Sequence, residues 1–178
     1  MRVLGLCGSL RKDSHNRRLL DASAVEFGGD VELTVFEGLG DIPAYSDDTE
    51  APASVSKLVS AIRAADAVLV ATPEYNASIP GHLKNALDWV SVPFADNPLL
   101  GKPAAVIGAS TGLFGAVWAQ AEARKVLKTI GARVVEMELP IGQADDVLAD
   151  GLTDPDLRAV LAELLGALVA EVHKAAAS

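Results

Sequence analysis

Residues 66–90 read DAVLVATPEYNASIPGHLKNALDWV, and this stretch contains the unit from which the fold is built. Its first part, residues 66–72, is almost continuously apolar, as expected of a strand that is covered on both faces of a sheet. A loop bracketed by Pro73 and Pro80 follows, and proline suits the first position of a helix, here one that continues to about Val90. The stretch therefore predicts a buried strand, a stiff loop and a helix.

The same strand-to-helix pattern repeats along the rest of the chain. Four more apolar runs predict strands, at residues 2–7, 31–36, 103–109 and 132–139. Periodic apolar positions and capping residues predict further helices at residues 14–27, 53–64, 115–130 and from Asp154-Pro155 onward. Because strands and helices alternate, the sheet should be parallel, with helices on both faces. We expect an α/β fold in a single domain over residues 1–178: a flavodoxin-like, doubly wound, five-stranded parallel sheet of order 2-1-3-4-5.

Composition and charge exclude several classes of protein. Half of the 178 residues are apolar and 22% are charged, which excludes a disordered chain. The net charge of −9, with no basic block, argues against nucleic-acid and anionic-membrane partners. The apolar run at residues 2–7 is too short for a membrane span or a signal peptide, so we expect a cytoplasmic protein. A single cysteine, Cys7, excludes an intrachain disulfide, and we expect no metal site.

The loop after the first predicted strand combines groups that suit a phosphate monoester. Ser9, Ser14 and Asn16 offer short hydrogen-bonding side chains, and Arg11 offers a planar cation. The helix that follows starts with free backbone N–H groups, which also attract anions. A hydrophilic turn with Ser14 as a simple helix cap is the alternative interpretation. The loop lacks both G-x-G-x-x-G and G-K-[ST], which argues against a Rossmann dehydrogenase and a P-loop NTPase.

Two more loops should lie at the same edge of the sheet. The two prolines stiffen the loop over residues 73–80, which can present backbone groups to a flat heterocycle. Residues 108–115, GASTGLFG, are mostly small, which lets the backbone approach a ligand closely. Each loop alone could be a surface turn, but parallel strands bring their carboxyl ends to one edge, where ligands bind in such folds.

Three motifs in these loops resemble those of the NADPH-dependent FMN reductase family, a flavodoxin-like group that includes bacterial quinone, azo and chromate reductases. The phosphate-loop motif, G-S-x-R-x-x-S-x-N, is matched at Gly8, Ser9, Arg11, Ser14 and Asn16. The flavin-ring motif is matched without a break from Pro73 through Trp89. The third motif is matched at Gly108, Ser110, Gly112, Gly115, Ala119, Gln120 and Arg124. The resemblance covers roughly residues 2–140.

The resemblance implies that FMN binds at these loops. The residues implied at the phosphate are Ser9, Arg11, Ser14 and Asn16, with the backbone of His15. Those implied along one side of the isoalloxazine are Pro73, Glu74, Tyr75 and Asn76, with Ser110, Thr111 and Gly112 on the other. FMN would pass a hydride from NADPH or NADH, in a ping-pong cycle, to a quinone-like, azo, nitro, chromate or flavin acceptor. No side chain is expected as a catalytic acid or base, because the cofactor carries the chemistry. The resemblance also implies a homodimer or homotetramer.

Two other functions stay open. The first is a flavodoxin-type electron carrier without substrate turnover, and the second is a reductase that binds FMN only as a passing substrate. A carrier flips a glycine-containing peptide near the flavin, whereas residues 74–79 contain no glycine and should avoid positive φ. For an oligomer we expect apolar residues of the third and fourth predicted helices at the interface, namely Leu83, Leu87, Trp89, Val117, Trp118 and Ala121, although a core position for either tryptophan is equally compatible with the sequence.

Overall fold

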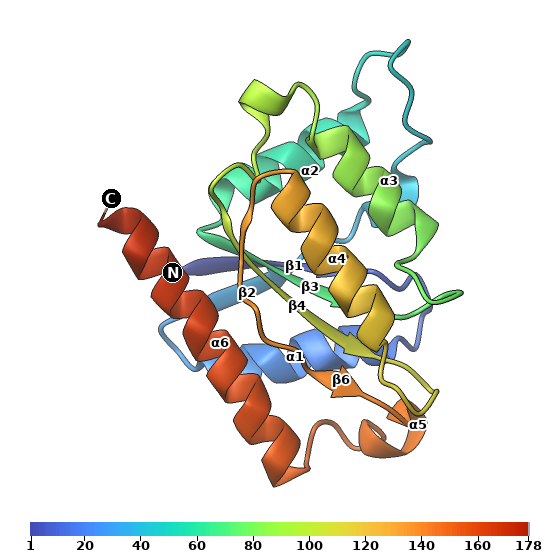
Figure 1. The fold of residues 1–178 in the computed structure, drawn as a ribbon, viewed down its shortest axis with the longest axis vertical. Coiled ribbons are helices and arrows are strands. Elements are labelled where there is room, and N and C mark those ends of the chain that lie inside the picture. The colour runs from blue at the N-terminus through green and yellow to red at the C-terminus, as the bar shows by residue number, and fades with distance from the viewer. Residues whose placement is uncertain (178) are drawn as a thin grey trace.

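The computed structural model describes residues 1–177, and in it the strands form one parallel sheet with helices on both faces (Figure 1). The longer strands are β1 (Arg2–Cys7), β2 (Glu32–Val35), β3 (Ala67–Thr72) and β4 (Pro103–Ala109). Two short strands, β5 (Arg133–Val134) and β6 (Pro140–Ile141), both pair with β4. The order β2-β1-β3-β4-β5 confirms the prediction.

The helices are α1 (His15–Phe27), α2 (Ala53–Ala64), α3 (Gly81–Val90), α4 (Val117–Thr129), α5 (Ala144–Val147) and α6 (Pro155–Ala176), with 3-10 turns η1 (Leu39–Asp41) and η2 (Phe94–Asp96). Five of the helices lie where the sequence predicts them, although α4 begins at Val117 and not at residue 115, and the sequence does not predict the short helix α5. Ser14 caps α1 by accepting a hydrogen bond from the N–H of Arg17, and Asp154 caps α6 in the same way. In Figure 1, α1 and α6 lie on one face of the sheet and α2, α3 and α4 on the other.

Alternation of side chains along the strands divides the core into two layers. On β3, Val68 and Val70 pack in the cluster that contains α2, α3 and α4. Leu69 and Ala71 pack in the cluster that contains α1 and α6. Cys7 is buried in this second layer, as expected of a small core side chain. Strand β2 lies at the edge of the sheet and alternates in burial, which confirms its predicted position.

The predicted fifth strand, residues 132–139, is wrong in extent. Only Arg133–Val134 pair with β4 before the chain leaves the ladder, and it returns as β6 beside the carboxyl end of β4. Between the two strands, Glu136 and Glu138 form ion pairs with Lys128 and Arg124 of α4. Alternating apolar and acidic residues cannot distinguish a long strand from a segment that is tied to a helix. The four-residue helix α5 is too short to give a periodic pattern.

None of the helices in residues 1–177 combines the length and the apolar character that crossing a bilayer would require.

Candidate functional site

Three loops meet at the carboxyl edge of the sheet and enclose a hollow of about 100 Å³. It is lined by Ser9, Arg11, Ser14, His15, Asn16, Pro73, Glu74, Tyr75, Ala109, Ser110 and Thr111. Ser9 to Asn16 belong to the loop after β1 and the start of α1, Pro73 to Tyr75 follow β3, and Ala109 to Thr111 lie at the end of β4 and just beyond it. Ten of the twelve predicted site residues therefore line one hollow, and the other two, Asn76 and Gly112, are their neighbours in the chain.

The first loop is arranged around the N-terminus of α1. Ser14 is only 4% exposed, and its Oγ accepts the N–H of Arg17 at 3.2 Å. Ser9 accepts the N–H of Arg11 through its hydroxyl at 3.4 Å. The N–H groups of the first two helical residues, His15 and Asn16, have no acceptor within the helix. The loop thus presents N–H donors, two hydroxyls and an exposed guanidinium to an anion.

Asn16 uses most of its hydrogen-bonding capacity inside the protein. Its side chain is 2% exposed, its Nδ2 donates to the carbonyl of Ala109 at 2.9 Å, and its Oδ1 accepts the N–H of Ala109 at 3.0 Å. This reciprocal pair ties the start of α1 to the end of β4. Asn16 therefore shapes the hollow by holding Ala109, and one hydrogen of its amide nitrogen is left for a ligand.

His15 lines the hollow, and its side chain makes a contact that the sequence does not indicate. The imidazole is 10% exposed, and its Nε2 lies 2.9 Å from Oδ1 of Asp145 in α5. Its Nδ1 is buried and has no hydrogen-bond partner among the residues that the structure describes. The contact with Asp145 spans 130 positions of the chain, so no local motif could indicate it.

Glu74 connects the second loop with the third. Its Oε2 accepts the N–H groups of Trp118 and Ala119, at 3.0 and 3.1 Å, in the first turn of α4. The residue before this helix, Ala116, has a φ of 59° and no side-chain acceptor to cap it. Glu74 therefore caps α4 from another loop, and its negative charge suits the N-terminal end of the helix dipole. Sequence reasoning assigns Glu74 only to the flavin ring.

The loop after β3 contains a tight turn with left-handed residues. Tyr75 and Ser78 exchange N–H···O bonds of 3.0 and 3.1 Å, and the two residues between them, Asn76 and Ala77, have φ values of 53° and 60°. The expectation that residues 74–79 avoid positive φ is therefore wrong. A left-handed conformation costs a residue other than glycine about 1–2 kcal/mol, and turns of this geometry favour glycine at the second central position. Strained backbone of this kind is concentrated at functional sites.

The segment around β6 supports the third loop. Ser110 donates its N–H to Ile141 at 3.0 Å, and its carbonyl accepts the N–H of Ala144 at 3.1 Å. Gly112 accepts the N–H of Gln143 at 3.0 Å. Residues 141–144, which lie beyond the predicted fifth strand, therefore hold Ser110 and Gly112 in place.

Two other residues of the third motif lie behind the site. Gln120 is fully buried, and its amide nitrogen donates to the carbonyls of Gly115 and Leu139 at 3.0 and 3.2 Å. The side chain of Arg124 is 9% exposed and pairs with Glu138. These residues position the third loop and the strand that follows α4.

The apolar side chains of α3 that we expected at an interface lie in the core of the same chain, which for Trp89 is the alternative that the sequence left open. Leu83 and Leu87 are buried, and Trp89 is 5% exposed and donates its indole N–H to the carbonyl of Pro43 at 2.8 Å.

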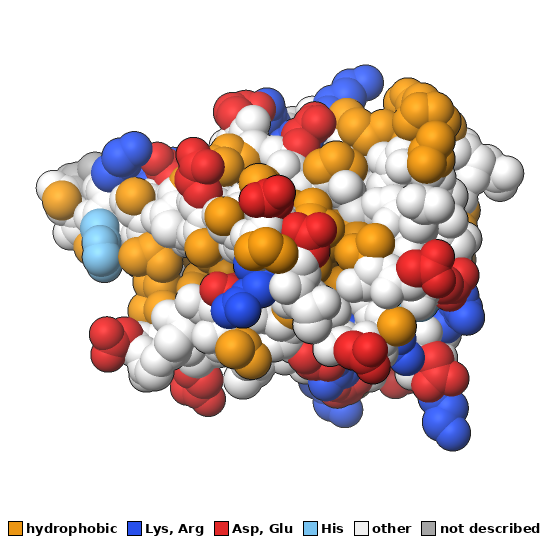
Figure 2. All heavy atoms as spheres, turned by 90° about the horizontal axis from the view of Figure 1, so that it is seen from below, with side chains coloured by type: hydrophobic (Ala, Val, Ile, Leu, Met, Phe, Trp, Pro, Cys, Tyr) orange, Lys and Arg blue, Asp and Glu red, His pale blue; other side chains and the backbone are white. Residues whose placement is uncertain are grey.

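Exposed apolar side chains lie instead beside the third loop. Leu113, Phe114 and Trp118, here called the apolar patch, are 72%, 62% and 49% exposed. The rings of Phe114 and Trp118 meet edge to face at 5.1 Å. In Figure 2, hydrophobic side chains gather at the corner farthest from the C-terminal end of α6.

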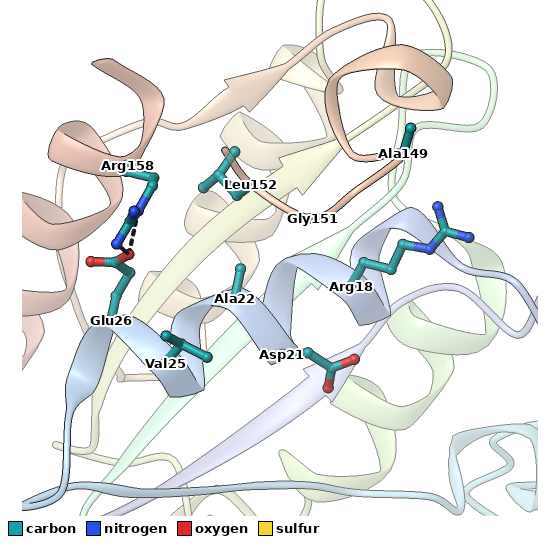
Figure 3. A pocket seen from close by; sticks show the side chains of 9 residues that line it. All are labelled: Arg18, Asp21, Ala22, Val25, Glu26, Ala149, Gly151, Leu152 and Arg158. Carbon is teal, nitrogen blue, oxygen red and sulfur yellow. Dashed lines mark hydrogen bonds and ion pairs between the residues drawn. The ribbon is translucent and has the colours of Figure 1, made fainter. Parts of the chain in front are cut away.

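A larger hollow, of about 550 Å³, lies away from these loops. Figure 3 shows it between α1 and the segment that leads into α6, with Ala22 and Leu152 on facing walls and the ion pair of Glu26 with Arg158 at one end. It contains none of the predicted site residues. We therefore place the candidate site at the smaller hollow, where the chemically distinctive groups converge.

Comparison with known proteins identifies the family of the chain. A model of the family described as NADPH-dependent FMN reductase matches residues 1–146. An NAD(P)H-dependent FMN reductase of Pseudomonas aeruginosa is 41% identical over 176 residues, covering 94% of this chain and 93% of the relative. A quinone reductase of Escherichia coli is 38% identical over 139 residues, covering 76% of this chain and 73% of the relative.

Solved structures show the same relationship. FerB of Paracoccus denitrificans, a flavoenzyme described as an NAD(P)H:(acceptor) oxidoreductase, has a TM-score of 0.85 and 40% identity over 97% of both chains. A flavodoxin from the domain Archaea has a TM-score of 0.62 at 13% identity, covering 98% of this chain and 99% of that one, and shares the fold alone. The length of the family match and the identity to these relatives show that the chain belongs to the NADPH-dependent FMN reductase family.

Proposed function

We propose that this protein is an FMN-dependent oxidoreductase that takes a hydride from NADPH or NADH and reduces a small-molecule acceptor in a ping-pong cycle. The acceptors that we propose are quinone-like, azo, nitro, chromate or flavin compounds. The observation that carries the proposal is the meeting of all three predicted loops at one hollow, at the edge where such sheets bind ligands. Because its electron donor is an intracellular coenzyme, we place its activity in the cytoplasm.

The first loop fits the phosphate of FMN. Free N–H groups at the start of α1, the hydroxyls of Ser9 and Ser14, and the guanidinium of Arg11 are the donors that a phosphate monoester needs. The buried Nδ1 of His15, which has no partner in the described part of the chain, is a further polar group that this anion could satisfy.

The second and third loops are arranged to hold the isoalloxazine ring of FMN by its edge. Pockets that enclose a small ligand usually measure about 300–1,000 Å³, so the hollow of about 100 Å³ is too small to surround an isoalloxazine. We propose that Tyr75, which is 46% exposed, and the backbone of Ser110 to Gly112 hold the ring with one face open. Donor and acceptor would then use this face in turn, which is the physical reason for a ping-pong cycle.

The protein itself would bind FMN, orient its ring and shield it from water. When bound, FMN supplies the hydride chemistry, accepting from the nicotinamide and donating to the acceptor. Glu74 keeps the second and third loops in register by capping α4, and Asn16 keeps the first loop against the third. Both residues therefore set the distance between the phosphate end and the ring end of the site.

We further propose that the protein is a homodimer or homotetramer whose contact includes the apolar patch. Exposed aromatic side chains that lie next to one another, such as Phe114 and Trp118, are enriched at association surfaces. Since the patch directly follows Ser110, Thr111 and Gly112, a second subunit there would lie beside the ring end of the site.

Steady-state kinetics of the FMN-loaded protein test the function. Initial rates are measured over a grid of NADPH or NADH and benzoquinone concentrations. Parallel double-reciprocal lines, with FMN retained through gel filtration, are expected. Intersecting lines with flavin lost on filtration would support the reductase that uses FMN as a passing substrate. The absence of turnover with every acceptor, despite retained FMN, would support the electron carrier.

A further inference from the structure

His15 lies at the first position of α1 and is one of the residues that line the hollow. The side chain is nine-tenths buried, and Oδ1 of Asp145 holds its Nε2 at 2.9 Å. Its other ring nitrogen, Nδ1, is shielded from solvent and unpaired within residues 1–177. A buried polar atom without a partner is costly, and in native proteins it usually has a functional explanation.

We propose that His15 and Asp145 form a pair that recognises the terminal phosphate of FMN. In this pair, Nδ1 of His15 donates a hydrogen bond to a phosphate oxygen. Asp145 is the positioning residue, because it holds the ring through Nε2. The proposal rests on the function proposed above. It assigns a role to the His15 side chain, whereas the family motif leaves this position variable, and to Asp145, which lies outside all three motifs.

The chemistry of the two acceptors determines the state of the ring. An ionised carboxylate can only accept hydrogen bonds, so Nε2 of His15 carries the hydrogen shared with Asp145. A phosphate oxygen without a proton can also only accept, so Nδ1 must carry a hydrogen too. The ring is then an imidazolium, and its positive charge adds to that of Arg11 in compensating the phosphate. The carboxylate of Asp145 lies on the Nε2 side of this ring, at 2.9 Å.

The position of the pair fits this role. An anion that accepts the free N–H of His15, at the start of α1, lies next to the ring of the same residue. On the other side, α5 is fastened to the third loop by the hydrogen bond from the N–H of Ala144 to the carbonyl of Ser110. The contact of His15 with Asp145 therefore links the phosphate end of the site to the segment that supports the ring end.

Flavin titration distinguishes the contribution of this pair from that of the rest of the site. FMN and riboflavin differ only in the phosphate, and their dissociation constants are measured by quenching of flavin fluorescence at pH 7. For His15→Phe, which keeps a planar ring without nitrogen, we expect FMN to bind about tenfold to a hundredfold more weakly, with riboflavin unchanged. For Asp145→Asn, which keeps an acceptor for Nε2 without the charge, we expect a smaller loss of about twofold to fivefold for FMN alone.

Asp146→Asn is the matched control, because it removes the same charge from the next position of α5, and it should leave both dissociation constants unchanged. Should His15→Phe fail to fold, Asp145→Asn decides alone, since the Asp145 side chain is 70% exposed and can be changed without disturbing the core. Wild-type protein that binds FMN and riboflavin equally would contradict the proposed phosphate site as a whole. Wild-type preference for FMN that His15→Phe and Asp145→Asn both retain would overturn only this pair.

Nitrogen-15 NMR of labelled histidine gives a readout that does not depend on affinity. The chain has three histidines, so the His15 signals can be assigned with the His15→Phe variant. In the FMN complex both ring nitrogens of His15 should carry hydrogen, and in the riboflavin complex the two-donor state should be less populated. An unprotonated Nδ1 in the FMN complex would contradict the proposal.

Discussion

Arg11 is the exposed cation on which the proposed phosphate site depends most. Losing a hydrogen bond to a charged group costs about 1.5–3 kcal/mol, so Arg11→Ala should weaken FMN binding by about tenfold to a hundredfold. Riboflavin binding should not change, and isothermal titration with both flavins measures the difference. The neighbouring exposed cation Lys12 provides the control, because it does not line the hollow. An equal loss in Lys12→Ala would mean that general charge, and not Arg11, attracts the phosphate.

Ala77 is the residue at which backbone strain can be measured. Because alanine pays a penalty at a φ of 60° and glycine does not, Ala77→Gly should raise the free energy of unfolding by up to about 1 kcal/mol. The branched side chain in Ala77→Val should lower it. Urea denaturation of the three proteins tests this order. A destabilised Ala77→Gly would contradict the left-handed turn.

Individual residues were predictable where a local pattern carries the information. Ser14 before a periodic apolar run is a helix cap in the sequence and in the structure. The left-handed Asn76 and Ala77 could not be predicted, because their conformation is imposed by the bonds between Tyr75 and Ser78. The hydrogen-bond partners of His15, Asn16 and Glu74 could not be predicted either, because each partner is distant in the sequence.

The start of α4 depends on Glu74. Removing a helix-capping acceptor costs about 1 kcal/mol, so Glu74→Ala should lower the free energy of unfolding by about that amount. Because the change loosens the second and third loops, FMN and riboflavin should both bind more weakly by the same factor. Thermal unfolding and flavin titration measure the two effects, with the exposed Glu163→Ala of α6 as control. A loss confined to FMN would mean that Glu74 acts on the phosphate and not on the loops.

His82, in the first turn of α3, should make the free energy of unfolding depend on pH. Burial lowers the pKa of His82 below its usual range, and a hydrogen bond with the backbone of Gly8 offsets only part of the shift. Below about pH 6.5 the unfolded chain binds a proton that folded His82 does not, so this stability is present above that pH and is lost as the pH falls.

Urea midpoints between pH 7.5 and pH 5.5 should therefore fall less in His82→Gln than in the wild type. The exposed His173→Gln is the control and should follow the wild type. Identical slopes for His82→Gln and the wild type would show that His82 titrates alike in the folded and unfolded chains.

Long elements with a clear period were predictable, and short ones were not. The bounds predicted for α2, residues 53–64, agree with the structure, because apolar residues recur there at helical spacing. Residues 132–141 contain two strands of two residues each, which are placed by pairing with β4 and by ion pairs with α4. The positions of these two strands depend on contacts with β4 and α4 and not on a local pattern in the sequence.

The apolar patch should control the assembly of the protein. A charged residue at its centre opposes burial against a second subunit, so Trp118→Asp should shift the protein toward monomers. Light scattering after gel filtration at micromolar concentration measures the mass. Val25→Asp, which changes a 75% exposed valine of α1, provides the control and should assemble as the wild type does. A wild-type monomer that retains FMN and turns over would contradict the proposed oligomer.

Anaerobic mixing of the FMN-loaded protein with NADPH or NADH, followed by benzoquinone, tests the proposed function most directly. The flavin absorbance should bleach on mixing with at least one nicotinamide and should return to the oxidised spectrum within one turnover when benzoquinone is added. Arg11→Ala reloaded with excess FMN should repeat both steps, because the phosphate site holds the cofactor and takes no part in hydride transfer. Protein that retains FMN but is not bleached by either nicotinamide would contradict the proposed oxidoreductase and favour an electron carrier.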